Sequence, residues 1–241
     1  MPILTLKDVQ YAYPDGNTAV AGVSFTLKKG QSVGLVGANG AGKSTLLMLL
    51  PGALLPTAGS IEVDGVTLTK ATSAKLRRLV GLVFQDADDQ LFTTTVREDV
   101  AFGPRNMGLV EQEVQRAVQK ALDQCGITHL ADRAPYCLSG GEQKLAAIAS
   151  VLSMEPELLI MDEPSASLDP KARRGIIRLL NSLPMTKLIA SHDLDLVWEV
   201  CSRVIVLKDG RVEADGDAKE LLGNQDLMER CGLELPLRLQ R

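Results

Sequence analysis

The stretch GLVGANGAGKSTLL, from Gly34 to Leu47, restricts what this chain can fold into more than any other part of the sequence. It begins within a short apolar run, SVGLVG, which is typical of a buried parallel strand. It leads into KSTLLMLL, which predicts a helix that ends near Pro51, because proline disrupts a helix interior. A glycine-rich turn between a buried strand and a helix is the context in which a loop binds phosphate groups.

The residues from Gly37 to Ser44 match the spacing G-x-x-x-x-G-K-[ST]. Glycines allow the backbone to curl so that successive N–H groups point inward, and these donors form a cradle for anions. Lys43 can reach the β- and γ-phosphates of a nucleotide, and the Ser44 hydroxyl can bind Mg²⁺. We therefore predict a nucleotide site formed by Gly37, Ala38, Asn39, Gly40, Ala41, Gly42, Lys43, Ser44 and Thr45.

Two adjacent acidic residues lie at the end of a second buried strand. The run Leu158–Met161 is apolar, and Asp162 and Glu163 follow it directly. Ligands of open α/β sheets bind at the carboxyl ends of the strands, so both carboxylates are expected beside the glycine-rich loop. We predict that Asp162 holds Mg²⁺ through water and that Glu163 polarises the attacking water. Ordinary loop charges are the alternative explanation for such a pair.

Strand patterns occur at both ends of the chain, and a helical stretch separates them. The first residues alternate like paired strands around PDGN, and SIEVDGVTL is typical of a hairpin. Helical periodicity dominates residues 86–150, after which strands and helices alternate again. We predict an α/β fold with a parallel sheet, an N-terminal antiparallel β-subdomain and an inserted α-helical subdomain. The predicted parts are 1–85 and 151–222 for the core with the β-subdomain, 86–150 for the helices and 223–241 for the tail.

Composition argues against several other functions. The net charge is −4 and only 3% of the residues are aromatic, so neither a phosphate-backbone surface nor a base-stacking surface for nucleic acid is expected. The four cysteines are scattered without a C-x-x-C pair, which indicates reduced thiols rather than disulfides or a metal site. MPILTLKDVQ does not resemble a signal peptide, and the longest apolar stretch is too short to span a bilayer. We expect a soluble protein that reaches a membrane only through a partner.

Beyond these motifs, the chain resembles the ATPase subunits of ATP-binding cassette (ABC) transporters. LSGGE, at Leu138–Glu142, resembles the cassette signature, and SLD, at Ser167–Asp169, resembles the D-loop. Gln85 follows the predicted strand GLVF as the Q-loop glutamine does, and His192 in ASHD is similar to the switch histidine. The resemblance covers essentially the whole chain. It implies a P-loop NTPase core of the RecA-like kind, a single ABC ATPase domain over 1–241, and hydrolysis of ATP with Mg²⁺.

The same resemblance assigns roles to individual residues. It implies that His192 hydrogen-bonds the γ-phosphate and aligns the water beside Glu163, and that Gln85 senses Mg²⁺. The catalytic residues are then Glu163, His192, Gln85 and Lys43, and the Mg²⁺ ligands are Ser44, Gln85 and Asp162.

Two further contacts to the nucleotide follow from the resemblance. Tyr13 is similar to the aromatic residue that stacks on adenine, although Tyr11 competes for this role and Tyr13 could instead face the core. Ser139, Gly140 and Gly141 at a helix start form a second anion site, which faces the γ-phosphate bound by another subunit. We interpret His129 as a structural polar residue.

The chain carries one phosphate loop and one signature, and in the family geometry neither completes a site alone. The resemblance therefore implies that two chains meet head to tail, that ATP joins them and that hydrolysis releases them. We predict a second ABC ATPase chain as partner, most simply in a homodimer, and an integral membrane transporter subunit. The expected location is the cytoplasmic face of the cell membrane, as a peripheral protein.

One stretch after the Q-loop indicates a subgroup. VGLVFQDADDQLFTTTVREDVAFGPRNMGL resembles the energy-coupling factor group, and most of all its cobalt and nickel importer ATPases. This implies an ATPase that energises uptake of cobalt or nickel. The alternatives are a vitamin importer of the same architecture, a nucleotide-gated switch outside transport, and a catalytically weak binding module. Gln90–Val96 is our candidate edge of the partner surface, unless Leu91 and Phe92 are core residues.

Three residues depart from the family pattern. Glu142 ends the signature where glutamine is usual, and its carboxylate either repels phosphate or caps the helix start. Leu145 stands where many members have arginine, and Pro51 should end the preceding helix early. The departures at Glu142 and Leu145 affect the expected turnover rather than nucleotide binding.

Overall fold

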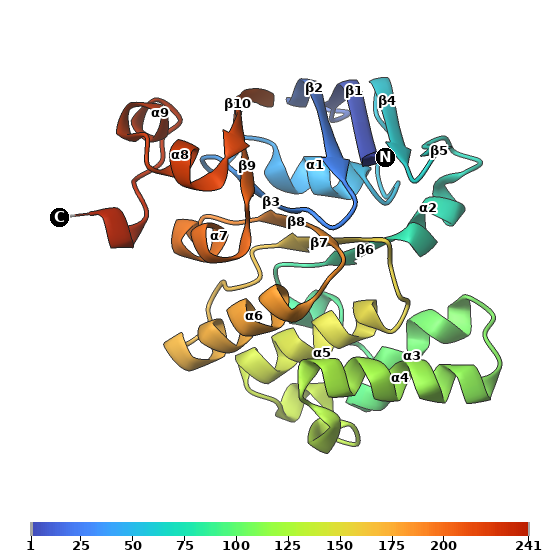
Figure 1. Ribbon diagram of the computed structural model, residues 1–241. Helices are drawn as coiled ribbons and strands as arrows, with labels where there is room; N and C mark the ends of the chain where they lie inside the picture. The colour runs from blue at the N-terminus through green and yellow to red at the C-terminus, as the bar shows by residue number, and fades with distance from the viewer. Residues whose placement is uncertain (1, 241) are drawn as a thin grey trace.

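The computed structural model describes residues 2–240, which form two sheets with helices between and below them (Figure 1). The upper sheet has four strands in the order β2-β1-β4-β5, and all its pairs are antiparallel. Its strands are β1 (Pro2–Ala12), β2 (Thr18–Lys28), β4 (Ala58–Val63) and β5 (Val66–Thr67). Strands β4 and β5 turn at Asp64 and Gly65, both of which have positive φ, as the hairpin pattern predicts.

The central sheet has six strands in the order β10-β9-β3-β8-β7-β6. They are β3 (Ser32–Val36), β6 (Val80–Val83), β7 (Leu158–Asp162), β8 (Thr186–Ala190), β9 (Arg203–Lys208) and β10 (Arg211–Asp217). The pairs among β3, β6, β7, β8 and β9 are parallel, and β10 is antiparallel to β9 at one edge. The predicted fold class is therefore confirmed.

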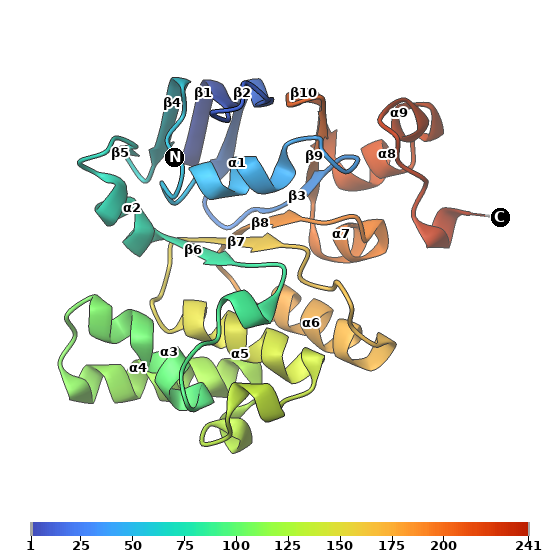
Figure 2. The same ribbon diagram turned by 180° about the vertical axis from the view of Figure 1, so that it is seen from behind.

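Helices cover both faces of the central sheet (Figure 2). Helix α1 lies between the two sheets, whereas α3, α4, α5 and α6 lie on the opposite face of the central sheet. The helices are α1 (Lys43–Leu49), α2 (Ser73–Leu79), α3 (Val96–Asn106), α4 (Glu111–Cys125), α5 (Gly140–Leu152), α6 (Pro170–Ser182), α7 (Leu194–Val200), α8 (Ala218–Leu222) and α9 (Gln225–Arg230). Short 3₁₀ turns occur at Ala87–Asp89, Thr128–Leu130, Pro135–Cys137 and Leu237–Leu239.

The central sheet separates two apolar cores. One lies between the sheets and includes Leu46, Leu47 and Leu50, which are fully or almost fully buried. The other lies between the central sheet and the helical layer and extends among the helices, where Val114, Val118, Ala121 and Leu122 of α4 form the buried stripe that helical spacing predicts. Because the parallel strands are buried on both faces, the centre of each is a short run without charged residues, as in LLIM of β7 and VIVL of β9.

Two element ends bear on the sequence predictions. Helix α1 stops at Leu49, just before Pro51, as predicted. Helix α5 continues to Leu152 and so crosses the boundary predicted at residue 150. The helical pattern of GGEQKLAAIASVLSM covers this last turn, in which Val151 and Leu152 are buried in the lower core.

The glycine-rich loop is wedged between the two sheets. In the turn from β9 to β10, the Gly210 carbonyl accepts a bond of 2.8 Å from the Ala21 amide of β2. The Gly210 amide donates to the Ala41 carbonyl of the loop at 3.2 Å. The loop, the upper sheet and the edge of the central sheet are therefore tied together at one point.

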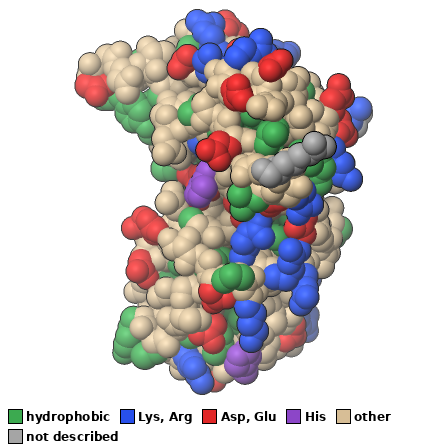
Figure 3. All heavy atoms as spheres, turned by 90° about the vertical axis from the view of Figure 1, so that its left-hand side faces the viewer, with side chains coloured by type: hydrophobic (Ala, Val, Ile, Leu, Met, Phe, Trp, Pro, Cys, Tyr) green, Lys and Arg blue, Asp and Glu red, His purple; other side chains and the backbone are tan. Residues whose placement is uncertain are grey.

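The surface seen from the side of the carboxyl-terminal tail is indented at mid-height, with Lys and Arg side chains gathered below the indentation (Figure 3). Three basic side chains of helix α6 are exposed, namely Lys171, Arg174 and Arg178. Over residues 2–240, no helix combines the length and the apolar character needed to cross a bilayer.

Candidate functional site

Two glycines of the phosphate loop cannot carry a side chain. A Cβ on Gly37 would lie 2.4 Å from the Leu207 carbonyl oxygen, and one on Gly42 would lie 2.2 Å from the Ala19 carbonyl oxygen. Gly42 also has φ of +96°, a conformation that L-residues rarely adopt. The glycines at these positions therefore let the loop curl tightly between β3 and α1, as a phosphate cradle requires.

The Lys43 side chain lies inside this curl. Its Nζ donates to the Gly37 carbonyl at 2.6 Å and to the Ala38 carbonyl at 3.1 Å. Burial lowers the pKa of Lys43, and the nearby carboxylates of Glu163 and Asp162 oppose that shift. An ammonium group held against the backbone of this loop suits a polyphosphate.

Asp162 ends β7, between β6 and β8, and faces the start of α1. Burial raises the pKa of Asp162, and the adjacent Glu163 raises it further, whereas a hydrogen bond with Ser44 and the charge of Lys43 lower it. A carboxylate, a hydroxyl and the amide oxygen of Gln85 are the hard oxygen donors that Mg²⁺ prefers. The residues present therefore fit a Mg²⁺ ion beside bound phosphates.

The Glu163 carboxylate is held from three sides. The Ser191 hydroxyl donates to it at 3.0 Å, the His192 amide donates to both of its oxygens at 3.0 Å, and His192 Nδ1 lies 2.8 Å from Oε2. Glu163 itself has φ of +46°, a sparsely populated conformation for a residue with a side chain. Such strain persists where the surrounding structure fixes the residue, which is the case here.

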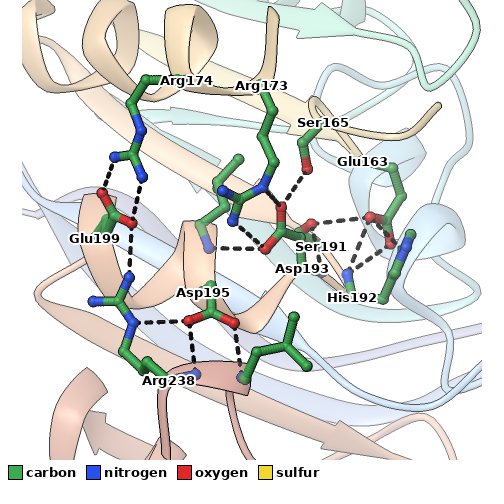
Figure 4. A network of polar contacts seen from close by, with 12 residues as sticks. Glu163, Ser165, Arg173, Arg174, Ser191, His192, Asp193, Asp195, Glu199 and Arg238 are labelled. Atoms are coloured by element: carbon green, nitrogen blue, oxygen red, sulfur yellow. Dashed lines mark hydrogen bonds and ion pairs between the residues drawn. The ribbon is translucent and has the colours of Figure 1, made fainter. Parts of the chain in front are cut away.

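A second group of contacts supports the His192 segment (Figure 4). The carboxylate of Asp193 accepts bonds from Ser165 at 2.9 Å and from two Arg173 nitrogens at 2.5 and 2.7 Å. Asp193 also caps α7 through the Leu196 amide. Burial alone would raise the pKa of Asp193, but the hydrogen bonds from Arg173, Leu196 and Ser165 outweigh it, and the pKa lies below its ordinary value.

One cavity of about 270 Å³ joins most of the predicted site residues. Its lining includes Tyr13, Asn39, Gly40, Gly42, Lys43, Ser44, Thr45, Gln85, Asp162 and Glu163. Tyr13 donates to or accepts from Thr45 Oγ1 at 2.9 Å, and its ring meets the edge of Tyr11 at 5.1 Å between centroids. Tyr13 lines this cavity and Tyr11 does not, which favours Tyr13 for contact with the base.

The predicted second anion site lies elsewhere, at the start of α5, where Ser139 precedes Gly140 and Gly141. Among residues 2–240, the lining of the cavity includes none of these three residues. Ser139 caps the helix, and both its amide and its hydroxyl donate to Glu142 Oε2 at 2.8 Å. The Ser139 backbone and side-chain hydrogen bonds lower the pKa of Glu142. Of the two orientations that the sequence left open for Glu142, the structure has the capping one.

Sequence reasoning missed several residues that hold the site together, namely Ser191, Asp193, Ser165 and Arg173. The tetrapeptide ASHD contains two of them beside His192, and the position of Asp193 before an apolar helix was a usable cap signal. No comparable signal exists for Arg173, because its partner is distant in sequence. Over residues 2–240, no three His, Cys, Asp or Glu side chains form a cluster that could hold a metal ion.

Comparison with known proteins places this geometry in context. The ABC transporter family model matches residues 20–166. A putative ABC transporter ATP-binding protein of Geobacter sulfurreducens is 52% identical over 238 residues, covering 99% of this chain and 96% of that protein. The energy-coupling factor transporter ATP-binding protein EcfA of Methanothermobacter thermautotrophicus is 45% identical over 239 residues, covering 97% of this chain and 77% of that protein.

Solved structures agree with the sequence relatives. The chain superposes on cbiO1 from Clostridium perfringens, described as part of the ABC transporter complex cbiONQ, with a TM-score of 0.85 and 41% identity, covering 95% of this chain and 94% of that one. A dimeric ATP-binding cassette in a post-hydrolysis state, bound to ADP and phosphate, has a TM-score of 0.80 and 29% identity, covering 89% of this chain and 98% of that one. The protein is therefore an ATPase that belongs to the ABC transporter family.

Proposed function

We propose that this chain is the ATP-hydrolysing subunit of an energy-coupling factor importer, and that it energises the uptake of cobalt or nickel ions. One observation carries the proposal: a single cavity contains the phosphate loop, Gln85, Asp162 and Glu163. The relatives named EcfA and cbiO1 support the type of transporter. The choice of cargo rests on the resemblance of the stretch after Gln85 to the cobalt and nickel importer ATPases. A vitamin importer with the same architecture is the main alternative.

The proposed chemistry is hydrolysis of ATP by a positioned water. The amides of Gly37–Ser44 and the Lys43 ammonium bind the phosphates, and Tyr13 stacks on the base. Ser44, Gln85 and Asp162 hold Mg²⁺, which when bound neutralises charge that develops on the phosphates. Glu163 polarises the water, and His192 orients Glu163 through the bond between Nδ1 and Oε2.

The second anion site requires another chain. Ser139–Gly141 begin α5 and lie apart from the cavity, so within one chain they do not reach the nucleotide. We propose that a second copy turns its Ser139–Gly141 toward the γ-phosphate, in a head-to-tail dimer. The dimeric state of the cassette bound to ADP and phosphate supports the formation of a dimer.

An apolar groove is the proposed contact for the membrane subunit. It has a volume of about 670 Å³ and lies between β6, α2, α3 and α5. Phe92 is 65% exposed at its rim and meets Phe102 edge-on, with 4.8 Å between ring centroids. Leu91, in contrast, is buried. Of the two residues for which a core position was the alternative, Leu91 is therefore a core residue and Phe92 is not. An exposed aromatic pair beside a groove favours docking of an apolar element.

Asp99 gives this groove a polar feature. Its Oδ1 accepts the amides of Phe92 and Thr93 at 3.0 Å, whereas the buried Oδ2 has no hydrogen-bond partner among residues 2–240. An unpaired buried carboxylate oxygen is costly unless a partner satisfies it. We propose that the membrane subunit inserts an apolar element into this groove and that one basic side chain of that element pairs with Asp99. In this arrangement, the ATPase chain is a peripheral protein on the cytoplasmic face of the membrane.

The central experiment substitutes the proposed catalytic carboxylate. Glu163→Gln should reduce phosphate release by at least about 10²-fold while ATP still binds, and ATP should then trap a dimer on gel filtration. Glu157→Gln is the control, because Glu157 precedes the same strand but is exposed and remote from the cavity. A Glu163→Gln protein that stays monomeric with ATP would argue against the dimer mechanism.

A second experiment tests the partner and the cargo. Phe92→Ala should weaken recovery of an integral membrane subunit from solubilised membranes, whereas Tyr136→Ala, which removes another exposed aromatic ring, should not. Uptake of Co²⁺ or Ni²⁺ by vesicles that contain the complex, lost with Glu163→Gln, supports the proposal. Vitamin uptake without metal uptake would favour the alternative cargo, and recovery of no membrane subunit would favour a switch protein.

A further inference from the structure

Lys144 is a buried cation whose ammonium contacts the loop that carries Gln85. It lies in α5, just after the signature residues, and is 3% exposed. Its Nζ donates to the Gln85 carbonyl at 2.5 Å and to the Phe84 carbonyl at 3.1 Å. No carboxylate forms an ion pair with it within residues 2–240. Burying an ammonium group is unfavourable unless it is hydrogen-bonded. Lys144 therefore depends on both carbonyls to remain buried.

Other side chains join the same helix to the same loop, residues 84–90, which we call the Gln85 loop. Gln90 accepts the Phe84 amide at 3.1 Å and donates to the Ala147 carbonyl of α5 at 2.7 Å and to Ser150 Oγ at 2.9 Å. Gln143 donates to Asp88 at 3.2 Å. These contacts lie along one face of α5, and Lys144 is the one that holds Gln85 itself.

We propose that Lys144 is a positioning residue for Gln85. By binding the Gln85 and Phe84 carbonyls, it fixes the backbone from which the exposed Gln85 side chain extends into the nucleotide cavity. Helix α5, which begins with Ser139–Gly141, therefore also fixes the position of Gln85. This inference rests on the proposed role of Gln85 as a Mg²⁺ ligand.

A matched control exists in Lys187. It is also buried, at 4% exposed, and its Nζ donates to a backbone carbonyl, that of Leu183, at 2.5 Å. Lys187 does not line the nucleotide cavity. Lys144→Met and Lys187→Met therefore remove the same group from similar surroundings, and only the first should affect Gln85.

The direct test is hydrogen exchange of the Gln85 loop in the full chain. Lys144→Met should raise the exchange rate of amides in residues 84–90 at least about tenfold, whereas Lys187→Met should leave them unchanged. If Lys144→Met does not fold, Lys144→Gln, which retains a neutral donor group, replaces it. Its exchange rates in residues 84–90 should rise as well, but by a smaller factor. Unchanged exchange in a folded Lys144 variant would overturn the inference.

The functional test measures metal binding without turnover. Mn²⁺ is titrated by electron paramagnetic resonance into the protein with a non-hydrolysable ATP analogue. Half-saturation should require about five- to tenfold more Mn²⁺ in Lys144→Met and in Gln85→Ala, but not in Lys187→Met. An effect of Gln85→Ala alone overturns the role of Lys144. If Gln85→Ala has no effect either, the proposed metal role of Gln85 fails, and the exchange experiment still decides whether Lys144 holds the loop.

Discussion

His192 and Glu163 are paired through a contact of 2.8 Å between Nδ1 and Oε2, and the imidazole remains 67% exposed on its outer side. With the proton on Nδ1, the ring donates to the carboxylate and leaves Nε2 free for the proposed hydrogen bond to the γ-phosphate. His192→Ala should therefore lower kcat about 10²-fold and change the KM for ATP by less than about threefold, measured by phosphate release. His129→Ala, which removes an exposed histidine from another part of the chain, should leave both constants unchanged. A large rise in KM would instead assign His192 to binding.

Two glycines of the phosphate loop should differ sharply in their tolerance of alanine. A Cβ on Gly42 meets the Ala19 carbonyl oxygen at 2.2 Å, whereas one on Gly40 has nothing within 4 Å. Gly42→Ala should abolish binding of a fluorescent ATP analogue and lower the unfolding free energy by more than about 2 kcal/mol. Gly40→Ala should cost about 1 kcal/mol, the strain of its positive φ, and retain measurable binding. Equal effects would show that conformation, not space, limits the loop.

The Arg173–Asp193 pair should make stability depend on pH in the acid range. The folded-state pKa of Asp193 is lowered, so its contribution is present above the unfolded pKa, near 3.9, and is lost as pH falls through the folded value. Asp193→Asn should lower the unfolding free energy at pH 7 by about 1.5–3 kcal/mol, and the difference from wild type should shrink below about pH 4. Asp132→Asn, in an exposed pair with Arg97, should cost less than about 1 kcal/mol. Urea titrations across pH measure both.

Tyr13 should contribute through its ring rather than its hydroxyl. Tyr13→Ala should weaken ATP binding about five- to tenfold, because one base–aromatic stack is lost. Tyr13→Phe, which removes only the hydrogen bond to Thr45, should change it less than about twofold. If Tyr11→Ala is the more damaging variant in calorimetric titration, Tyr11 is the stacking residue.

Glu142 should restrain dimer formation through its charge. Its carboxylate accepts both the amide and the hydroxyl of Ser139, the residue proposed to face the phosphate of a second chain. In the Glu163→Gln background, Glu142→Gln should tighten the ATP-dependent dimer about three- to tenfold in sedimentation, since glutamine keeps the capping box without repelling phosphate. Glu113→Gln makes the same change in the cap of α4 and should have no effect. Weaker association would mean that the carboxylate supports the interface.

Much of the fold could be predicted because its signals are local. The centres of the buried parallel strands are apolar runs, and the strand–glycine loop–helix order by itself predicts that the phosphate loop lies beside Asp162 and Glu163. Helix α5 was likewise visible as a helical pattern, GGEQKLAAIASVLSM, and the structure has it from Gly140 to Leu152.

The supporting residues of the site were hidden because their partners are distant in sequence. Ser191 and Glu163 are 28 positions apart, and Lys144 and Gln85 are 59 apart, so no pattern within a window of sequence relates them. Glu142 is an intermediate case: the signature located it, but two orientations of its side chain were compatible with a helix start. Only the hydrogen bonds with Ser139 distinguish the two.

The phosphate loop is held between the β2 strand and the turn at Gly210, which belong to different sheets. A ligand that occupies the loop binds only while both sheets keep this arrangement, and separation of the sheets destroys its binding surface. Added ligand therefore raises, by mass action, the free energy of unfolding of the whole molecule. Calorimetric melting of the two sheets should sharpen into one transition, at a temperature that rises with the logarithm of added nucleotide.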